Sequence, residues 1–293
     1  MIYEHPLAYL LGLEGIALLR GFTGEFNRDF VEARIAEIRD LLDNDSLANA
    51  AVEVDRVDTV EGYRRWSATY DQPGNAAFDI DEPLVKEIID ALSPGVALDA
   101  ACGTGRYSRL LAERGHQVIG VDSSPDMLAL APQGDFRLGE LHRLPIGDAE
   151  VDLVVCGLAL THIPDLGPAM AEFARVLREG GHLVIADMHP SAVARGSIPT
   201  SRDAEGRPGR VVTYRHSLGD YLRAALPLGL QLRRCEEPAV PLGTHPEPVD
   251  APREVGPWDL WPWCLSDLVP DAARAAIDGA PAMVIWHFQL KAS

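Results

Sequence analysis

The sequence predicts an α/β protein whose core is a doubly wound, mostly parallel sheet of seven strands. Three observations predict it. Short apolar runs alternate with helix-period segments from residue 81 onward, helix start and stop signals separate them, and a glycine-rich turn follows the first run. Parallel strands need crossover connections, which helices usually supply. We therefore expect helices on both faces of one sheet, preceded by a helical N-terminal extension.

The predicted strands follow one another through the middle of the chain. The first five are Val96–Ala100, Gln117–Val121, Phe136–Leu138, Val151–Cys156 and His182–Ala186. Between them, Ser124 with Pro125 behind it predicts a helix start, and Gly115 predicts a helix end. After His189 a polar, glycine-containing stretch indicates a loop or an extended excursion. Residues 220–237 return to helix and strand, and residues 282–292 supply the last strand.

The chain before Tyr63 is expected to be helical. Leucines at positions 7, 10, 11 and 18 share one stripe, and a second helix follows Asn27, a residue type that caps helices. The expected division is a helical N-terminal cover over residues 1–60 and a larger domain over residues 61–293. Within that domain, residues 61–190 are the ligand-binding core and residues 191–293 shape the substrate site.

Composition narrows the classes of function. The net charge of −18 repels a phosphate backbone, so nucleic acid is disfavoured as a partner. The four cysteines form no CxxC pair, which predicts no metal site and fits a reducing cytoplasm. The apolar N-terminus has no cationic start, and its uncharged runs are shorter than the roughly 20 residues that cross a bilayer. We expect no membrane segment there, but a helix docked on the chain or pairing two subunits in a homodimer.

The stretch LDAACGTGRYS, residues 98–108, combines a bare backbone with a carboxylate. Gly103 and Gly105 let the main chain turn tightly and approach a ligand. Ser108 replaces the third glycine of a dinucleotide fingerprint. The Asp99 carboxylate would oppose a pyrophosphate but favours a ligand with a cationic amine. Asp122 ends the next strand, where an acid accepts hydrogen bonds from ribose hydroxyls. The pattern indicates a nucleoside with a positive, amino-acid-like tail.

Four ordered motifs resemble those of the class I S-adenosylmethionine-dependent methyltransferases, in particular the small-molecule methyltransferase type 11, UbiE-like group. The motifs are LDAACGTG, VIGVDSSPDML, GELHRLPIGDAEVDLVVC and ALTHIPDLGPAMAEFARVLREGGHLVIAD. The resemblance covers about residues 61–187 and implies a Rossmann-like fold with S-adenosyl-L-methionine as cofactor. The first motif carries Ala101 where the family commonly has another glycine.

The resemblance also implies which residues contact the cofactor. Asp122 would hold the ribose, with Ser123 and Met127 against the adenine. Glu140, where the family more often has Asp, would sit near the adenine amino group. Tyr70 closes the segment YRRWSATYD, which resembles the family's entry segment beside the cofactor. The full set expected to bind the cofactor is Tyr70, Asp99, Ala101, Gly103, Gly105, Asp122, Ser123, Met127, Glu140, Leu141 and Cys156.

Three residues are candidates for acid–base chemistry. His162 follows the fourth strand and is expected near the sulfonium methyl, where it would deprotonate or orient an acceptor. Asp187 and His189 are the second choice, because residues two apart share one face of a strand.

We therefore expect methyl transfer to an oxygen, nitrogen or carbon of a small, partly apolar metabolite. Two alternatives stay open. One is a protein that binds S-adenosylmethionine but uses the pocket for another reaction or for sensing. The other is an NAD(P)-dependent oxidoreductase, against which Asp99 and Ser108 speak. Trp258, Trp261 and Trp263 either cover an apolar acceptor or pack their loop onto the body of the protein.

Overall fold

The computed structural model describes residues 1–67, 76–239 and 254–292. Contacts within the chain divide it into two compact units. Unit 1 comprises residues 1–57, 196–210 and 239–280, and unit 2 comprises residues 58–195, 211–238 and 281–293. This division differs from the one based on the sequence, which keeps residues 61–293 in one domain.

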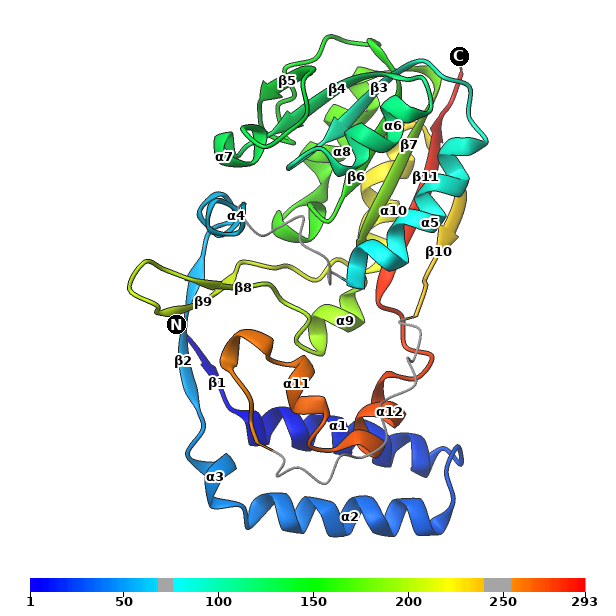
Figure 1. The fold of residues 1–293 in the computed structure, drawn as a ribbon. Coiled ribbons are helices and arrows are strands. Elements are labelled where there is room, and N and C mark those ends of the chain that lie inside the picture. Colours follow the sequence, from blue (N-terminus) through cyan, green and yellow to red (C-terminus); the bar gives the residue numbers. More distant parts are fainter. Residues whose placement is uncertain (68–75, 240–253, 293) are drawn as a thin grey trace. The chain divides into compact units, whose positions relative to one another are not determined.

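Unit 2 contains a seven-stranded sheet in the order β10-β11-β7-β6-β3-β4-β5 (Figure 1). The strands are β3 (Val96–Ala100), β4 (Gln117–Asp122), β5 (Asp135–Leu138), β6 (Val151–Gly157), β7 (Leu177–Met188), β10 (Leu230–Glu236) and β11 (Met283–Leu290). The β3, β4, β5, β6 and β7 strands pair in parallel, and β11 is antiparallel to both β7 and β10. The predicted fold class is confirmed.

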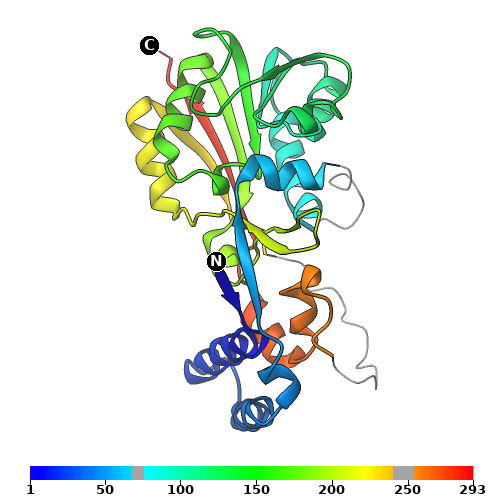
Figure 2. The same ribbon diagram turned by 90° about the vertical axis from the view of Figure 1, so that its left-hand side faces the viewer.

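Helices cover both faces of this sheet. One face carries α5 (Ala76–Asp90) and α6 (Arg106–Glu113), and the other carries α8 (Leu166–Val176) and α10 (Leu218–Ala225). In Figure 2 the cyan α5 and the yellow α10 lie on opposite sides of the strands. Ala97 belongs to the core under α5 and α6, whereas Leu98 and Ala100 belong to the core under α8 and α10. Because side chains alternate along a strand, a sheet covered on both faces is apolar throughout.

The helix signals read from the sequence are found where they were expected. Ser124 accepts a hydrogen bond from the Met127 N–H at 3.3 Å and caps α7 (Pro125–Leu128). Gly115 follows α6 with a φ of 81°, the left-handed conformation that ends many helices. Unit 2 also contains α4 (Thr59–Trp66), α9 (Pro190–Ala194) and two short 3₁₀ turns, Leu160–His162 and Leu226–Leu228.

The described residues of unit 1 form five helices and a small sheet. Its helices are α1 (Pro6–Phe22), α2 (Arg28–Leu42), α3 (Asp45–Ala48), α11 (Trp263–Ser266) and α12 (Pro270–Ile277), with a 3₁₀ turn at Trp258–Leu260. The α1 helix lies between α2 and α12 in both ribbon views. The sheet has the order β1-β2-β9-β8, with β1 (Ile2–Glu4), β2 (Val52–Val57), β8 (Thr200–Arg202) and β9 (Pro208–Val211).

The expectation that the chain before Tyr63 is all helical is wrong at β1 and β2, which pair antiparallel. The sequence of β2, VEVDRV, alternates valine with charged residues, and Val54 is completely buried. Branched valines fit a pleated, half-buried surface better than a helix. The excursion expected after His189 forms the β8–β9 hairpin in its second half.

Two of the three tryptophans between residues 258 and 263 pack into the core of unit 1. Trp258 and Trp261 are buried, and the Trp258 Nε1–H donates to Glu4 at 2.8 Å. Arg210 donates to the same carboxylate at 2.7 and 3.0 Å. Trp263, by contrast, is 58% exposed. Packing of the loop onto the body therefore describes Trp258 and Trp261.

No described helix combines the length and apolar character needed to cross a membrane. The described residues contain no group of three or more His, Cys, Asp or Glu side chains placed to hold a metal ion.

A buried carboxylate in unit 1 makes its stability depend on pH. Glu14 of α1 is fully buried, 3.8 Å from Arg34 of α2. Arg34 also contacts Glu37 at 2.9 Å and Asp271 at 3.8 Å. Burial, together with the nearby Glu37, raises the pKa of Glu14 to about 8. The folded state therefore holds a proton that the unfolded chain releases.

We predict that Glu14→Gln weakens this pH dependence. Between about pH 5 and pH 8 the free energy of unfolding of the parent chain should fall, by up to about 1.4 kcal/mol per pH unit from this group. The amide carries no titratable proton, so the fall should be smaller in the variant. Calorimetric unfolding of the full chain across this range measures the effect, with the exposed Glu32→Gln as control. Equal slopes in all three proteins would contradict the prediction.

Candidate functional site

A pocket of about 410 Å³ opens in unit 2 at the carboxyl ends of the parallel strands. Its walls come from the segments that follow β3, β4, β5 and β6, and from α4. The chain enters the sheet at β3 and extends it to β4 on one side and β6 on the other. Crossovers leave such a point in opposite directions, which is where open α/β sheets bind their ligands.

The turn after β3 is closed by the acid at the end of β4. Asp122 accepts hydrogen bonds from the backbone N–H groups of Gly103, at 2.7 Å, and Ser124, at 2.8 Å. Gly103 has a φ of 54° and Ala101 a φ of 57°, so an alanine occupies the left-handed region that favours glycine. A Cβ added to Gly103 would lie 3.2 Å from the end of the Met127 side chain. The turn is thus bare toward the pocket.

Asp99 is buried at the base of this turn and is held by Ser108. The Ser108 hydroxyl donates to the Asp99 carboxylate at 2.7 Å, and only 1% of Asp99 is exposed. Burial raises the pKa of Asp99 to about 6, against the lowering effect of Ser108 and of the nearby Arg106. The sequence pattern identified Ser108 only as the residue that replaces the third glycine of a dinucleotide fingerprint. Its position one helical turn inside α6, behind the strand-end acid, was the available signal of this second role.

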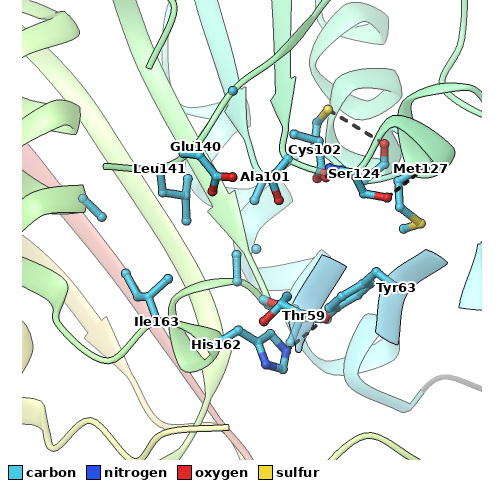
Figure 3. A pocket seen from close by; sticks show the side chains of 18 of the residues that line it. Thr59, Tyr63, Ala101, Cys102, Ser124, Met127, Glu140, Leu141, His162 and Ile163 are labelled. Carbon is cyan, nitrogen blue, oxygen red and sulfur yellow. Dashed lines mark hydrogen bonds between the residues drawn. The ribbon is translucent and has the colours of Figure 1, made fainter. Parts of the chain in front are cut away.

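Most of the expected cofactor residues meet in the pocket. Those that line it are Asp99, Ala101, Gly103, Asp122, Ser123, Met127, Glu140 and Leu141. Gly105 and Cys156 are not in the wall: Gly105 caps α6 beside Pro132, and Cys156 is buried inside β6. Tyr70 lies outside the described residues. Figure 3 shows Ala101, Met127, Glu140 and Leu141 on one side of the pocket, which we call the cofactor side.

The opposite side of the pocket carries His162 and Tyr63, which point toward each other in Figure 3. The Tyr63 hydroxyl lies 3.0 Å from His162 Nε2, and His162 Nδ1 lies 2.8 Å from the carbonyl oxygen of Val212. A carbonyl only accepts, so Nδ1 carries the hydrogen and Nε2 accepts from Tyr63. Burial lowers the pKa of His162, which favours the neutral imidazole. We call Tyr63, His162, Thr59 and Ile163 the acceptor side.

Sequence reasoning identified His162 but missed Tyr63. The two residues are 99 positions apart, and Tyr63 belongs to the helix α4 ahead of the core. The only signal was the aromatic content of the segment YRRWSATYD, which directed attention to its other tyrosine.

The structure does not bring Asp187 and His189 together in the pocket. Asp187 is completely buried and accepts hydrogen bonds from the N–H groups of Thr161 and Met188, at 2.8 and 2.7 Å. His189 contacts Glu237 at 2.8 Å and caps α9. Neither is among the described residues that line the pocket. Because β7 ends at Met188, the alternation of faces assumed for this pair does not reach His189.

Residues 98–185 match the sequence profile of a protein family described as a methyltransferase domain. The match begins in β3 and ends in β7, so it contains the turn, both strand-end acids and His162. This segment therefore resembles a methyltransferase domain.

Curated relatives of the methyltransferase domain differ in what they act on. One is a malonyl-[acyl-carrier protein] O-methyltransferase of Serratia marcescens, 32% identical over 163 residues, which are 54% of this chain and 61% of the relative. Another is a demethylmenaquinone methyltransferase of Deinococcus radiodurans, 39% identical over 112 residues, or 35% of this chain and 46% of the relative. The chain thus spans less than two thirds of the length of these relatives.

Solved structures share the fold. A methyltransferase in complex with the Haloferax volcanii Trm112 activator covers 80% of this chain and 98% of its own, with a TM-score of 0.59 and 18% identity. An S-adenosylmethionine-dependent methyltransferase from Mesorhizobium loti covers 73% of this chain and 98% of its own, with a TM-score of 0.51 and 20% identity.

We predict that Ser108→Ala weakens cofactor binding. The variant removes the only hydroxyl that the described structure places on Asp99, so the pKa of that buried carboxyl rises and less of it is ionised at pH 7. A hydrogen bond to a charged group contributes about 1.5–3 kcal/mol, which corresponds to roughly a tenfold or larger loss of affinity. Calorimetry with S-adenosylmethionine measures the loss. Ser46→Ala, in unit 1, is the control, and equal affinities in both variants would contradict the prediction.

The left-handed backbone conformation of Ala101 leads to a second prediction, which concerns stability. Ala101→Gly should raise the free energy of unfolding by about 0.5 kcal/mol, because relief of about 1–2 kcal/mol of strain exceeds the added entropy of the unfolded glycine chain. Ala101→Val should lower it by more than 1 kcal/mol, since a branched residue is strained there. Urea unfolding measures both. In the exposed helix position Ala112, glycine should instead destabilise by about 1 kcal/mol; the same sign at both positions would refute the argument.

Proposed function

We propose that this protein transfers the methyl group of S-adenosylmethionine to a small, partly apolar metabolite in the pocket of unit 2. One observation carries the proposal. The pocket has two strand-end carboxylates on the cofactor side, the buried Asp99 and the half-buried Asp122, and a neutral histidine hydrogen-bonded to a tyrosine on the acceptor side. A cationic nucleoside and a proton-bearing acceptor are the ligands that these two sides suit.

The residues of the cofactor side fit the cofactor. When bound, S-adenosylmethionine supplies a methyl group on a positively charged sulfur. Asp99 offers its carboxylate to the amine of the amino-acid tail, and Gly103 presents backbone without a side chain. Each carboxylate oxygen of Asp122 accepts one backbone N–H, from Gly103 or from Ser124, and has a further lone pair that can accept from a ribose hydroxyl. Glu140 is exposed and Leu141 is half-buried at the rim, where they suit the adenine.

The residues of the acceptor side position the acceptor and take its proton. Methyl transfer depends on alignment and exclusion of water more than on covalent catalysis. His162 is the proposed base, because its Nε2 is unprotonated and the residue lines the pocket. Val60, Ile163, Pro164 and Pro168 add apolar surface to the wall, which supports a partly apolar acceptor. The names of the curated relatives point to different acceptors, so they select none for this chain.

The net charge, the cysteines and the exposed apolar side chains of α1 support proposals about partners and location. The net charge of −18 supports a small molecule over nucleic acid as the acceptor. The four cysteines are unpaired, which supports the cytoplasm as the location. Phe22 and Leu19 of α1 are 91% and 66% exposed, and they are the candidates for pairing two subunits in a homodimer.

The decisive experiment is calorimetric titration of S-adenosylmethionine at several pH values, with NAD as the competing cofactor. Affinity should fall as the pH drops through about 6, because protonated Asp99 no longer attracts the amine. Asp99→Asn should lower the affinity at pH 7 by about 10- to 100-fold. Asp126→Asn, on the exposed first turn of α7, is the matched control.

Each outcome separates the candidate functions. Binding of NAD without binding of S-adenosylmethionine would favour the oxidoreductase. Binding of S-adenosylmethionine without release of S-adenosylhomocysteine, for any acceptor in a panel of hydroxyls, amines and carboxylates, would favour a sensing role. A pH-independent affinity would remove Asp99 from the site.

A further inference from the structure

Both ring nitrogens of His162 are occupied by protein groups. Nδ1–H donates to the carbonyl oxygen of Val212, and Nε2 accepts from the Tyr63 hydroxyl. The two rings meet edge to face, with centroids 5.5 Å apart and planes at 82°. His162 is only 8% exposed, whereas Tyr63 is half-buried. Both residues line the pocket, and the Tyr63 hydroxyl occupies Nε2, so a proton from an acceptor in the pocket reaches the imidazole through that hydroxyl.

We propose that Tyr63 is the catalytic residue that touches the acceptor, and that it relays the acceptor's proton to His162. The proposal deepens the function proposed above and rests on it. It assigns Tyr63 a chemical role and His162 the role of terminal base.

The relay conserves atoms and charge. The acceptor O–H gives its proton to the Tyr63 oxygen while Tyr63 gives its own hydrogen to His162 Nε2. The acceptor oxygen forms a bond to the methyl carbon as the bond between that carbon and sulfur breaks, and the electron pair of the broken bond stays on sulfur. The products are a methyl ether, a neutral thioether and a histidine that carries the positive charge. No oxidant or reductant is needed.

The hydrogen bonds of Tyr63 are compatible with the state before the proton transfer and with the state after it. Besides His162, the carbonyl oxygen of Leu158 lies 3.4 Å from the Tyr63 oxygen and accepts from it. When His162 is protonated, Nε2–H donates to the Tyr63 oxygen. The hydrogen on that oxygen then points toward the product or toward the carbonyl of Leu158. The buried imidazolium therefore keeps both of its partners.

The lining charges indicate which acceptors use the relay. Asp99, Asp122, Glu140 and Asp165 all line the pocket, so a carboxylate acceptor is repelled. The guanidinium of Arg106, also in the wall, is held by Asp81 at 2.6 and 2.9 Å. An amine that arrives uncharged attacks without a base. The acceptor class that needs a proton removed and carries no charge of its own is a hydroxyl, either phenolic or alcoholic.

The test uses 4-nitrophenol, whose ionised form absorbs visible light, with the full chain saturated with S-adenosylhomocysteine. At a pH where the free probe is mostly neutral, the parent protein should give a saturable nitrophenolate band. Tyr63→Phe and His162→Gln should each reduce the band at least about tenfold, and the double variant should match the single ones because the two residues act as a unit. Methyl transfer to any hydroxyl acceptor found in the panel should fall by about 100-fold or more in the same variants.

Controls separate the relay from folding and from the proposed function. Tyr214→Phe removes a phenolic hydroxyl outside the described pocket wall and should leave the band unchanged. Unaltered affinity for S-adenosylhomocysteine shows that the variants are folded. If the parent chain does not bind S-adenosylhomocysteine, the proposed function fails, and the probe titration without it still decides the relay. A band kept by Tyr63→Phe but lost by His162→Gln, or no band in the parent chain, would overturn the proposal.

Discussion

The carboxylate of Asp122 fixes the geometry on which the cofactor side depends. It joins two loops by accepting one backbone N–H from the turn after β3 and one from the start of α7. Hydrogen bonds to a charged group contribute about 1.5–3 kcal/mol each. A single left-handed alanine costs about 1–2 kcal/mol, so the two bonds are sufficient to hold Ala101 in its strained conformation. The close approach of the backbone to a nucleoside thus depends on an acid from the neighbouring strand.

Local patterns in the sequence were enough to predict the sheet and most of the cofactor side. Asp99, Gly103 and Asp122 lie at strand ends, and parallel strands bring such ends to one edge regardless of the details of packing. Capping by Ser124 is likewise a property of neighbouring residues. The prediction failed where an alternation was extended past its strand, since β7 stops before His189. It also missed β2, because the segment VEVDRV, with valines at 52, 54 and 57, was interpreted as part of a longer helical N-terminal region.

Long-range contacts were beyond the reach of the sequence. Tyr63 meets His162 across 99 positions, and Arg210 meets Glu4 across 206. Unit 1 is assembled from three separate stretches of chain, so no single boundary in the sequence marks it. The tryptophans show the same limit: their composition suggested either a lid or a packed loop, and only burial against residues from the N-terminus distinguished the two for Trp258 and Trp261.

The hydrogen bond between His162 and the carbonyl of Val212 has a consequence for how this protein can diverge. The partner that sets the imidazole tautomer is a main-chain atom, which every amino acid supplies at that position. Point mutations at Val212 therefore leave the carbonyl oxygen that accepts from Nδ1 in place. The side chain of Tyr63, by contrast, is replaced by any mutation at that position. Under the proposed relay, descendants of this chain can exchange the group that meets the methyl acceptor and still inherit a correctly oriented base. Selection for a new methyl acceptor would accordingly act first on α4.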